Sequence, residues 1–458
     1  MDATLQHAPR LEELARQLGL DYYPVEFEVV PPAFMMEVAV YGLPVRMPHW
    51  SFGVRYIYQL VQHRMGHSKI FEVVYPGNPG RAYLANTNAL HENTLVVAHV
   101  LGHADFSKNN LLFKRAQEQV GFHVVEQAAA HAHHIEEAMA EHGQGRVEAV
   151  LDAALALEQH IDDGKDLNRP SYPAHTKRPE RPTPQGFQLR FSTLPGEELP
   201  RPVSYEHERT PIPPHPEYDL LWFLAHYAPD MEDWERDIFL AVRAESFYFH
   251  PVFACQIMNE GWASYWHARL LREANFLPNA LYVDAMKSHS DVVRPFAGEH
   301  QIALSLNPYH LGFVLWDKII EKHGLATARK IMCEEDDTGF LHNYLEAELA
   351  QELGLFVFTG KRDGEIKVEE WDIDALHETI LASKYNFGAP RIGVFSVGVD
   401  GALELRHDHV TDGRGLDLEH GRKVLDYIHR VWRRPVFLYT VDAKGRETVL
   451  ESGAKEDL

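Results

Sequence analysis

Residues Met258–His267 read MNEGWASYWH, and this stretch decides how the rest of the chain folds. Its tryptophans, tyrosine and alanine are typical of a helix buried in a protein core rather than of one that faces solvent. Glu260 and His267 are seven positions apart, about two helical turns, so both polar side chains lie on one stripe of this helix. Because a buried carboxylate needs a partner, another part of the chain must face Glu260.

The stretch AHVLGH, residues 98–103, supplies that partner. His99 and His103 are four positions apart, which places two imidazoles on one helix face where they can bind one metal ion. Gly102 permits a second helix to approach closely. Together with Glu260, the histidines form a three-ligand set for one divalent metal, zinc in the first place and iron or manganese as alternatives. The alternative interpretation is a pair of histidines satisfied within the core.

Two outcomes are open for the fourth coordination position. A water at this position beside a general base would favour a metal-dependent hydrolase, whereas His267 or His289 as a fourth protein ligand would favour a closed, structural site. The zincin signature H-E-x-x-H carries its base at the position that Val100 occupies here, so a hydrolase must take its base from elsewhere. The candidates for the base, or for assisting the chemistry, are Asp105, Glu245, His267 and Tyr265.

The composition of the 458-residue chain excludes several classes of protein. Hydrophobic residues make up 45% of it, enough to bury a large core in roughly two or three domains. The formal net charge of −23 argues against a binder of nucleic acid or of an anionic membrane, which would carry a basic face. Two cysteines, no secretory signal and no long apolar run indicate a soluble cytoplasmic protein.

The periodicity of the sequence predicts a mainly α-helical chain with a small α+β module at its C-terminal end. A PGNPG turn predicts a β-hairpin within residues 69–90, and two further hairpins flank a helix in the C-terminal module. Closely spaced prolines favour an irregular linker or insertion before the helical core. The predicted segments are 1–163 with the histidine pair, 164–217 rich in proline, 218–385 with the Glu260 helix, and 386–458 as the α+β module.

Three local features are also predicted. Residues 23–41 are expected to be extended and interrupted by prolines. Phe249–Pro251 is expected to form the turn that precedes the MNEGWASYWH helix. Asn307 followed by Pro308 predicts the start of another helix, because proline suits the first helical position and asparagine can cap the backbone.

Several long motifs resemble the SpoVR family, which is named after stage V sporulation protein R. The resemblance extends from about Tyr22 to the C-terminal module and rests on the segments HVLGHADFSKNN, MNEGWASYWH, KSHSDVVRP, NPYHLGF and EEDDTGFLHNYL, in this order. It implies a cytoplasmic bacterial protein that is linked, in spore formers, to the formation of cortex peptidoglycan. In other bacteria the family is associated with a stress-related serine protein kinase. The family name brings no established reaction with it.

A second, narrower resemblance bears on the metal site. NEGWASY, residues 259–265, is similar to the NEGFASY stretch of gluzincin aminopeptidases, in which the glutamate is the third zinc ligand. Carried over, this implies a gluzincin-like helical site of Glu260 with His99 and His103, and Val100 departs from the pattern. One hypothesis is a hydrolase of an amide or peptide bond, with a peptide or peptidoglycan precursor as substrate. The other is a non-catalytic regulatory or scaffold protein that works with the kinase system.

Overall fold

The computed structural model describes residues 2–64, 71–165, 212–294, 307–355, 358–360, 366–368, 373–382, 388–398 and 400–453. The chain is mainly helical and carries a small sheet near its C-terminal end, as the sequence predicts. It divides into two compact units, one of residues 1–148 with 241–389 and the other of residues 149–240 with 390–458. Most of the predicted proline-rich segment, residues 166–211, lies outside the described residues.

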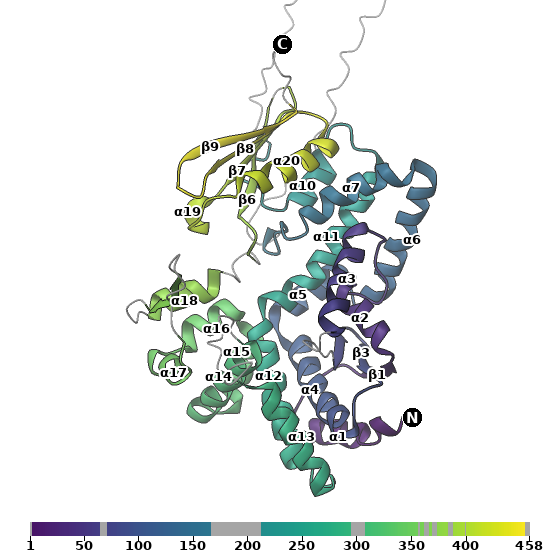
Figure 1. Ribbon diagram of the computed structural model, residues 1–458, viewed down its shortest axis with the longest axis vertical. Helices are drawn as coiled ribbons and strands as arrows, with labels where there is room; N and C mark the ends of the chain where they lie inside the picture. The colour runs from purple at the N-terminus through teal and green to yellow at the C-terminus, as the bar shows by residue number, and fades with distance from the viewer. Residues whose placement is uncertain are drawn as a thin grey trace, which may run out of the picture. The chain divides into compact units, whose positions relative to one another are not determined.

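Three helices form the centre of the first unit (Figure 1): α4 (Leu90–Asn109), α12 (Gln256–Glu273) and α14 (Pro308–His323). Helix α12 contains the MNEGWASYWH stretch, and it packs against α4 on one side and α14 on the other. Trp262 and Trp266 are completely buried, which confirms that this helix belongs to the core. The indole of Trp316 on α14 packs against Trp262 and donates a hydrogen bond to the Met258 carbonyl oxygen.

Glycines bring the backbones of these three helices into direct contact. A Cβ atom on Gly261 would overlap the backbone of Gly312, and one on Gly312 would overlap the Ile257 carbonyl oxygen. A Cβ atom on Gly102 would stand 2.7 Å from the Ala263 Cα atom, so the close approach predicted at Gly102 is confirmed. No side chain separates the helices at these crossings, and the residues beside the glycines are therefore held close together.

A buried acid fixes the start of α12. The Asp337 carboxylate, on α16 (Asp337–Tyr344), accepts hydrogen bonds of 2.9 Å from the backbone nitrogens of Ile257 and Met258. These nitrogens belong to the first turn of α12, where they have no acceptor within the helix itself. A negative charge at a helix N-terminus also interacts favourably with the helix dipole.

A three-stranded sheet leads into α4. Its strands are β1 (Val25–Val30), β2 (Glu72–Tyr75) and β3 (Gly80–Ala85), in the order β1-β3-β2. Strands β2 and β3 are antiparallel, which confirms the predicted hairpin, and β1 pairs with β3 in parallel. The short connection from β3 to α4 places this sheet close to the histidine-bearing helix.

Two of the local predictions are wrong. Residues 23–41 are not extended throughout, because β1 is followed by helix α2 (Pro32–Tyr41), whose Pro32 takes the first helical position that proline tolerates. Phe249–Pro251 is not a turn, since α11 (Asp233–Ala254) continues through Pro251. The Pro251 carbonyl still accepts a hydrogen bond from the Cys255 nitrogen, so proline removes only its own donor from the helix.

The first unit contains further helices. They are α1 (Ala8–Gln17), α3 (Trp50–Arg64), α5 (Leu111–Val120), α6 (Val124–His142), α13 (Asn279–Val292), α15 (Leu325–Glu334), α17 (Ala347–Glu352) and α18 (Ile373–Ala382). A short hairpin of β4 (Phe358–Gly360) and β5 (Ile366–Val368) precedes α18. The residue ranges of α7 (Gln144–Ala156) and α11 include the positions at which the chain is divided into units.

The second unit contains the predicted α+β module. Strands β6 (Ile392–Val397), β7 (Leu403–His407), β8 (Val436–Val441) and β9 (Glu447–Ser452) form one sheet in this order. The pairs β6–β7 and β8–β9 are the two predicted hairpins, and α20 (Leu418–Trp432) connects them and packs on β8 and β9. Helix α10 (Leu220–Tyr227) belongs to the same unit, with α19 (His409–Asp412) after β7.

The described helices include none that combines the length and the apolar character needed to cross a membrane.

The glycine contact between α12 and α14 yields the first prediction. Gly312→Ala should lower the free energy of unfolding by about 3 kcal/mol, because its methyl group has no space beside Ile257. Gly53→Ala in α3 is the matched control, since a Cβ atom there meets nothing within 4 Å and the change should be neutral or slightly stabilising. Urea unfolding measures both variants, and equal stability of the two would contradict the backbone contact.

Candidate metal centre

Three donor atoms from two helices converge in the first unit. The Nε2 atoms of His99 and His103, on α4, each lie 3.4 Å from Oε2 of Glu260 on α12. Ligand atoms about 2.1 Å from one tetrahedral zinc ion stand roughly 3.4 Å apart, so this spacing fits a single ion. Among the described residues, these three form the one group of histidine, cysteine or carboxylate donors that can share an ion.

The burial of these donors also fits a metal. His99 Nε2 and Glu260 Oε2 are buried atoms without a hydrogen-bond partner. Leaving such an atom unpaired costs about 1–3 kcal/mol, a cost that an ion between the three ligands would remove. The side chains of His99, His103 and Glu260 are 3%, 12% and 21% exposed, so solvent reaches the group mainly from the Glu260 side.

The charges of the three residues are coupled. Burial acts to raise the pKa of Glu260, but the charges and polar contacts of His103 and His99 together outweigh it and hold that pKa well below its ordinary value. Burial opposes the charged form of His103 as well, yet Glu260 and Asn259 raise the pKa of this imidazole. Burial and the charge of His103 lower the pKa of His99. One proton on His103 therefore balances Glu260, and a metal ion would take over that role.

Each histidine of the pair forms a hydrogen bond through its Nδ1 atom, on the side of the ring away from Glu260. Nδ1 of His103 donates to Oδ1 of Asn259 at 2.9 Å, which turns its Nε2 toward Glu260. Nδ1 of His99 lies 2.9 Å from Nδ1 of His267, and Nε2 of His267 lies 2.6 Å from Nδ1 of His289. Hydrogen bonds of this kind fix the orientation of metal-binding imidazoles.

His267 and His289 thus lie behind His99 and not within the ligand group. Both ring nitrogens of His267 face other histidines, so neither points at the space between His99, His103 and Glu260. Burial lowers the pKa of His267 well below its ordinary value. Burial, followed by the charge of Arg272, lowers the pKa of His289 to about 4. Both imidazoles are neutral at physiological pH.

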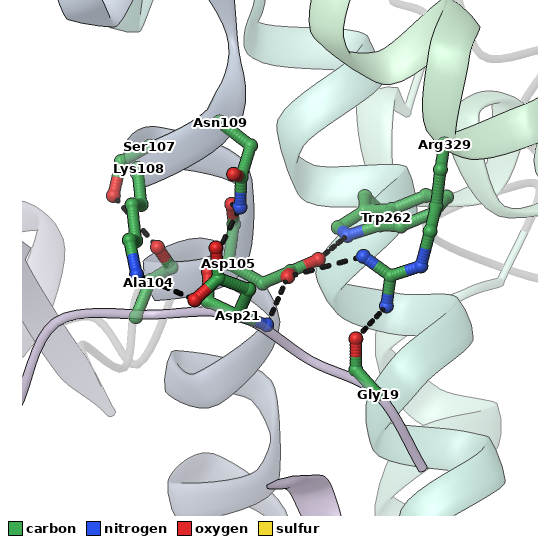
Figure 2. A network of polar contacts seen from close by, with 9 residues as sticks. All are labelled: Gly19, Asp21, Ala104, Asp105, Ser107, Lys108, Asn109, Trp262 and Arg329. Carbon is green, nitrogen blue, oxygen red and sulfur yellow. Dashed lines mark hydrogen bonds and ion pairs between the residues drawn. The ribbon is translucent and has the colours of Figure 1, made fainter.

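Asp105 lies in a separate polar network (Figure 2). One carboxylate oxygen accepts a hydrogen bond of 2.7 Å from the Asp21 backbone nitrogen and pairs with Arg329 at 3.3 Å. The other accepts a hydrogen bond of 2.9 Å from the Trp262 indole. Arg329 in turn donates to the Gly19 carbonyl oxygen, so this buried carboxylate fastens the N-terminal segment and α15 to the central helices.

Glu245 and Tyr265 also lie apart from the ligand group. The Glu245 carboxylate is buried on α11, where it pairs with Arg46 at 2.6 Å and faces His131 at 3.7 Å. Tyr265 is buried on α12 and its ring packs against those of Trp262 and Trp266. The structure therefore brings together His99, His103 and Glu260 from the predicted set, and it places Asp105, Glu245 and Tyr265 elsewhere.

Two residues of the site escaped the sequence analysis. Glu72, partly buried at the start of β2, interacts electrostatically with Glu260 and His103; burial, followed by the charge of Glu260, raises its pKa to about 7. Tyr309 interacts electrostatically with Glu260, and its ring stacks on that of His99 with centroids 6.1 Å apart. The charge of Glu260, followed by burial, raises the pKa of Tyr309.

Signals for both residues are present in the sequence. Glu72 is the one charged residue in the otherwise apolar stretch IFEVVY beside the hairpin turn. Tyr309 directly follows Pro308 at the start of α14, where Asn307 caps the helix by accepting a hydrogen bond from the Tyr309 nitrogen. The predicted cap is confirmed, and the same turn brings a tyrosine to the group of His99, His103 and Glu260.

Comparisons with known proteins cover nearly the whole chain. The family model described as SpoVR like protein matches residues 2–388. An Escherichia coli K12 protein described as "Uncharacterized protein YcgB" is 29% identical over an alignment of 476 residues, which covers 96% of this chain and 92% of that relative. No solved structure matches the chain.

The network around Asp105 yields the second prediction. Asp105→Asn should lower the free energy of unfolding by about 3 kcal/mol, because Arg329 and the Trp262 indole lose a buried charged partner. The zinc content should not change. Asp21→Asn is the control, because its exposed pair with Lys108 contributes about 1 kcal/mol or less. Urea unfolding and elemental analysis test this, and a loss of zinc in Asp105→Asn would instead place this carboxylate in the metal centre.

Proposed function

The chain belongs to the SpoVR family, and we propose that it is a metal-dependent hydrolase that acts on an amide or peptide bond. The observation that carries this proposal is the convergence of His99 Nε2 and His103 Nε2 on Glu260 Oε2, each at 3.4 Å, with all three atoms within 4.8 Å of one another. Three protein ligands leave one position of a tetrahedral ion for water or substrate, which is the arrangement of catalytic rather than structural zinc sites.

Zinc is the expected metal, with iron or manganese as alternatives, because two imidazoles and a carboxylate suit all three. When bound, such an ion lowers the pKa of water and polarises a carbonyl group. The residues of the chain hold the ion and orient its ligands. Asn259 and His267 keep the two imidazoles turned toward Glu260, as second-layer hydrogen bonds do in gluzincin-like sites.

The general base is proposed to be Glu72. Val100 occupies the usual position of the base and is completely buried. Asp105 and Glu245 are both engaged in ion pairs with arginines elsewhere. Glu72 interacts with His103 and Glu260 but does not belong to the ligand group, so its carboxylate can accept a proton from an attacking water and pass it to the leaving amine. A pKa of about 7 suits this exchange.

Tyr309 is proposed to donate a hydrogen bond to the oxygen of the scissile carbonyl. Its ring stacks on the ligand His99 and its hydroxyl reaches Glu260, so the donor stands at the edge of the ligand group. A fixed donor stabilises the negative charge that develops on this oxygen in the transition state. Because the pKa of Tyr309 is raised, the hydroxyl keeps its proton at physiological pH.

The biological setting is proposed from the family. Amide bonds of a peptide or a peptidoglycan precursor in the cytoplasm are the expected substrates. The alternative function is that of a non-catalytic metal-binding regulator that works with a serine protein kinase, and the apolar Val100 at the position of the usual base favours it. Hydrolysis by the metal-loaded protein separates the two functions.

The ligand assignment predicts near-stoichiometric zinc in the purified wild type. His103→Ala and Glu260→Ala should each weaken zinc binding by at least about 100-fold, because each removes a donor to the ion. Elemental analysis and competition with a chelating dye measure this, and circular dichroism checks the fold. His134→Ala is the control, since His134 is an exposed histidine of α6 and should leave zinc binding unchanged. A folded wild type that binds neither zinc, iron nor manganese would contradict the proposed function.

The assignment of the base predicts a different outcome for Glu72→Gln. This variant should retain its zinc but lose hydrolysis by about 100-fold or more, because the glutamine cannot accept a proton. Zinc-loaded protein and a panel of peptides and muropeptides provide the assay. Glu28→Gln, an exposed acid on the same sheet, is the control. Undiminished hydrolysis would place the base elsewhere, and zinc binding without hydrolysis in the wild type would favour the regulatory alternative.

A further inference from the structure

Three imidazoles form a row that begins at the metal centre and ends near the surface. Nδ1 of His99 faces Nδ1 of His267 at 2.9 Å, and Nε2 of His267 faces Nδ1 of His289 at 2.6 Å. His267 is completely buried, His99 is 2% exposed and His289 is 7% exposed. The ring of His289 also packs edge-on against Phe313. The row is therefore most exposed to solvent at its His289 end and completely buried at His267.

Such a row has two possible proton arrangements. A neutral imidazole carries one N–H donor and one acceptor nitrogen. At each contact one ring must donate and the other must accept, so the choice made at one end of the row determines the choice at every other position. Breaking the order would leave two lone pairs or two protons facing each other at a buried contact, at a cost of about 1–3 kcal/mol.

Without a cation, Glu260 determines the order. Nε2 of His99 lies 3.4 Å from the Glu260 carboxylate, which favours a proton on this nitrogen. Nδ1 of His99 then accepts from Nδ1 of His267, and Nε2 of His267 accepts from Nδ1 of His289. The outer nitrogen of His289 carries a lone pair in this arrangement.

With a cation, the order must reverse, because a metal ligand needs a lone pair on Nε2 of His99. This nitrogen releases its proton to solvent, and Nδ1 of His99 takes the proton of His267 Nδ1. Nε2 of His267 takes the proton of His289 Nδ1, and Nε2 of His289 gains one proton from solvent. Each ring stays neutral, no bond between heavy atoms changes, and the number of protons in the row is conserved.

We propose that His99, His267 and His289 form a proton-ordered chain that fixes His99 as an Nε2 ligand and reverses its order when a cation binds. His267 and His289 are thus positioning residues. When a cation occupies the centre, the outer nitrogen of His289, Nε2, changes from an acceptor to a donor. This inference rests on metal binding at the proposed centre and is independent of hydrolysis.

Two variants of His267 test the positioning role. His267→Asn keeps an oxygen that can accept from Nδ1 of His99, whereas His267→Leu has a similar volume and no acceptor. With zinc as the probe and competition with a chelating dye as the measurement, His267→Leu should bind zinc about 10–100-fold more weakly than the wild type. His267→Asn should bind within about threefold of the wild type. Equal zinc affinity of His267→Leu and wild type would overturn the proposal. The proposal would also be overturned if His267→Asn folds but binds zinc as weakly as folded His267→Leu.

The reversal is tested on the wild type, so that a variant that fails to fold does not decide the outcome. The 13C and 15N chemical shifts of labelled histidine distinguish the two neutral forms of the ring, and the His289 signals are assigned by their absence in His289→Gln. Zinc should move the His289 proton from Nδ1 to Nε2. An unchanged His289 form in zinc-loaded protein would overturn the inference while leaving the metal centre intact. A wild type that binds no zinc would instead overturn the proposed function.

Discussion

The direct backbone contact of α12 with its two neighbours is the constraint on which the rest of the first unit depends. Glycines remove the side chains at both crossings, and each glycine is next to, or close to, a residue of the site. Gly102 precedes His103, Gly261 follows Glu260, and Gly312 lies one turn after Tyr309. The same contacts that close the core therefore determine the distances between the ligand atoms, because no flexible side chain separates the helices.

Buried carboxylates have distinct tasks in this unit. Asp337 accepts hydrogen bonds from two backbone nitrogens of α12. Asp105 accepts from a backbone nitrogen and an indole and pairs with an arginine (Figure 2). Both acids hold parts of the central helices in place. Glu260 keeps an oxygen that no hydrogen bond satisfies. A buried charge persists only where partners compensate it, and the partners nearest to Glu260 are the imidazoles of His99 and His103.

Part of the fold and of the site follows from local patterns. The hairpins at PGNPG and at the two C-terminal turns, and the helices that carry His99 and Glu260, are where the sequence predicts them, because turn residues and helical periodicity act over short distances. Residues 32–41 were expected to be extended and form α2, since proline at the first helical position begins a helix as readily as it interrupts a strand.

Local patterns predict which side chains meet in the candidate metal centre, since a spacing of four residues places His99 and His103 on one face and the apolar neighbours of Glu260 bury its helix. Only the tertiary structure decided what surrounds them. Glu72 and Tyr309 come from a strand and a helix far away in sequence, and His267 faces Nδ1 of His99 rather than the space between the three side chains. Periodicity fixes which residues share a face of one helix, but the packing of helices against one another decides which atoms meet, and no local pattern encodes that packing.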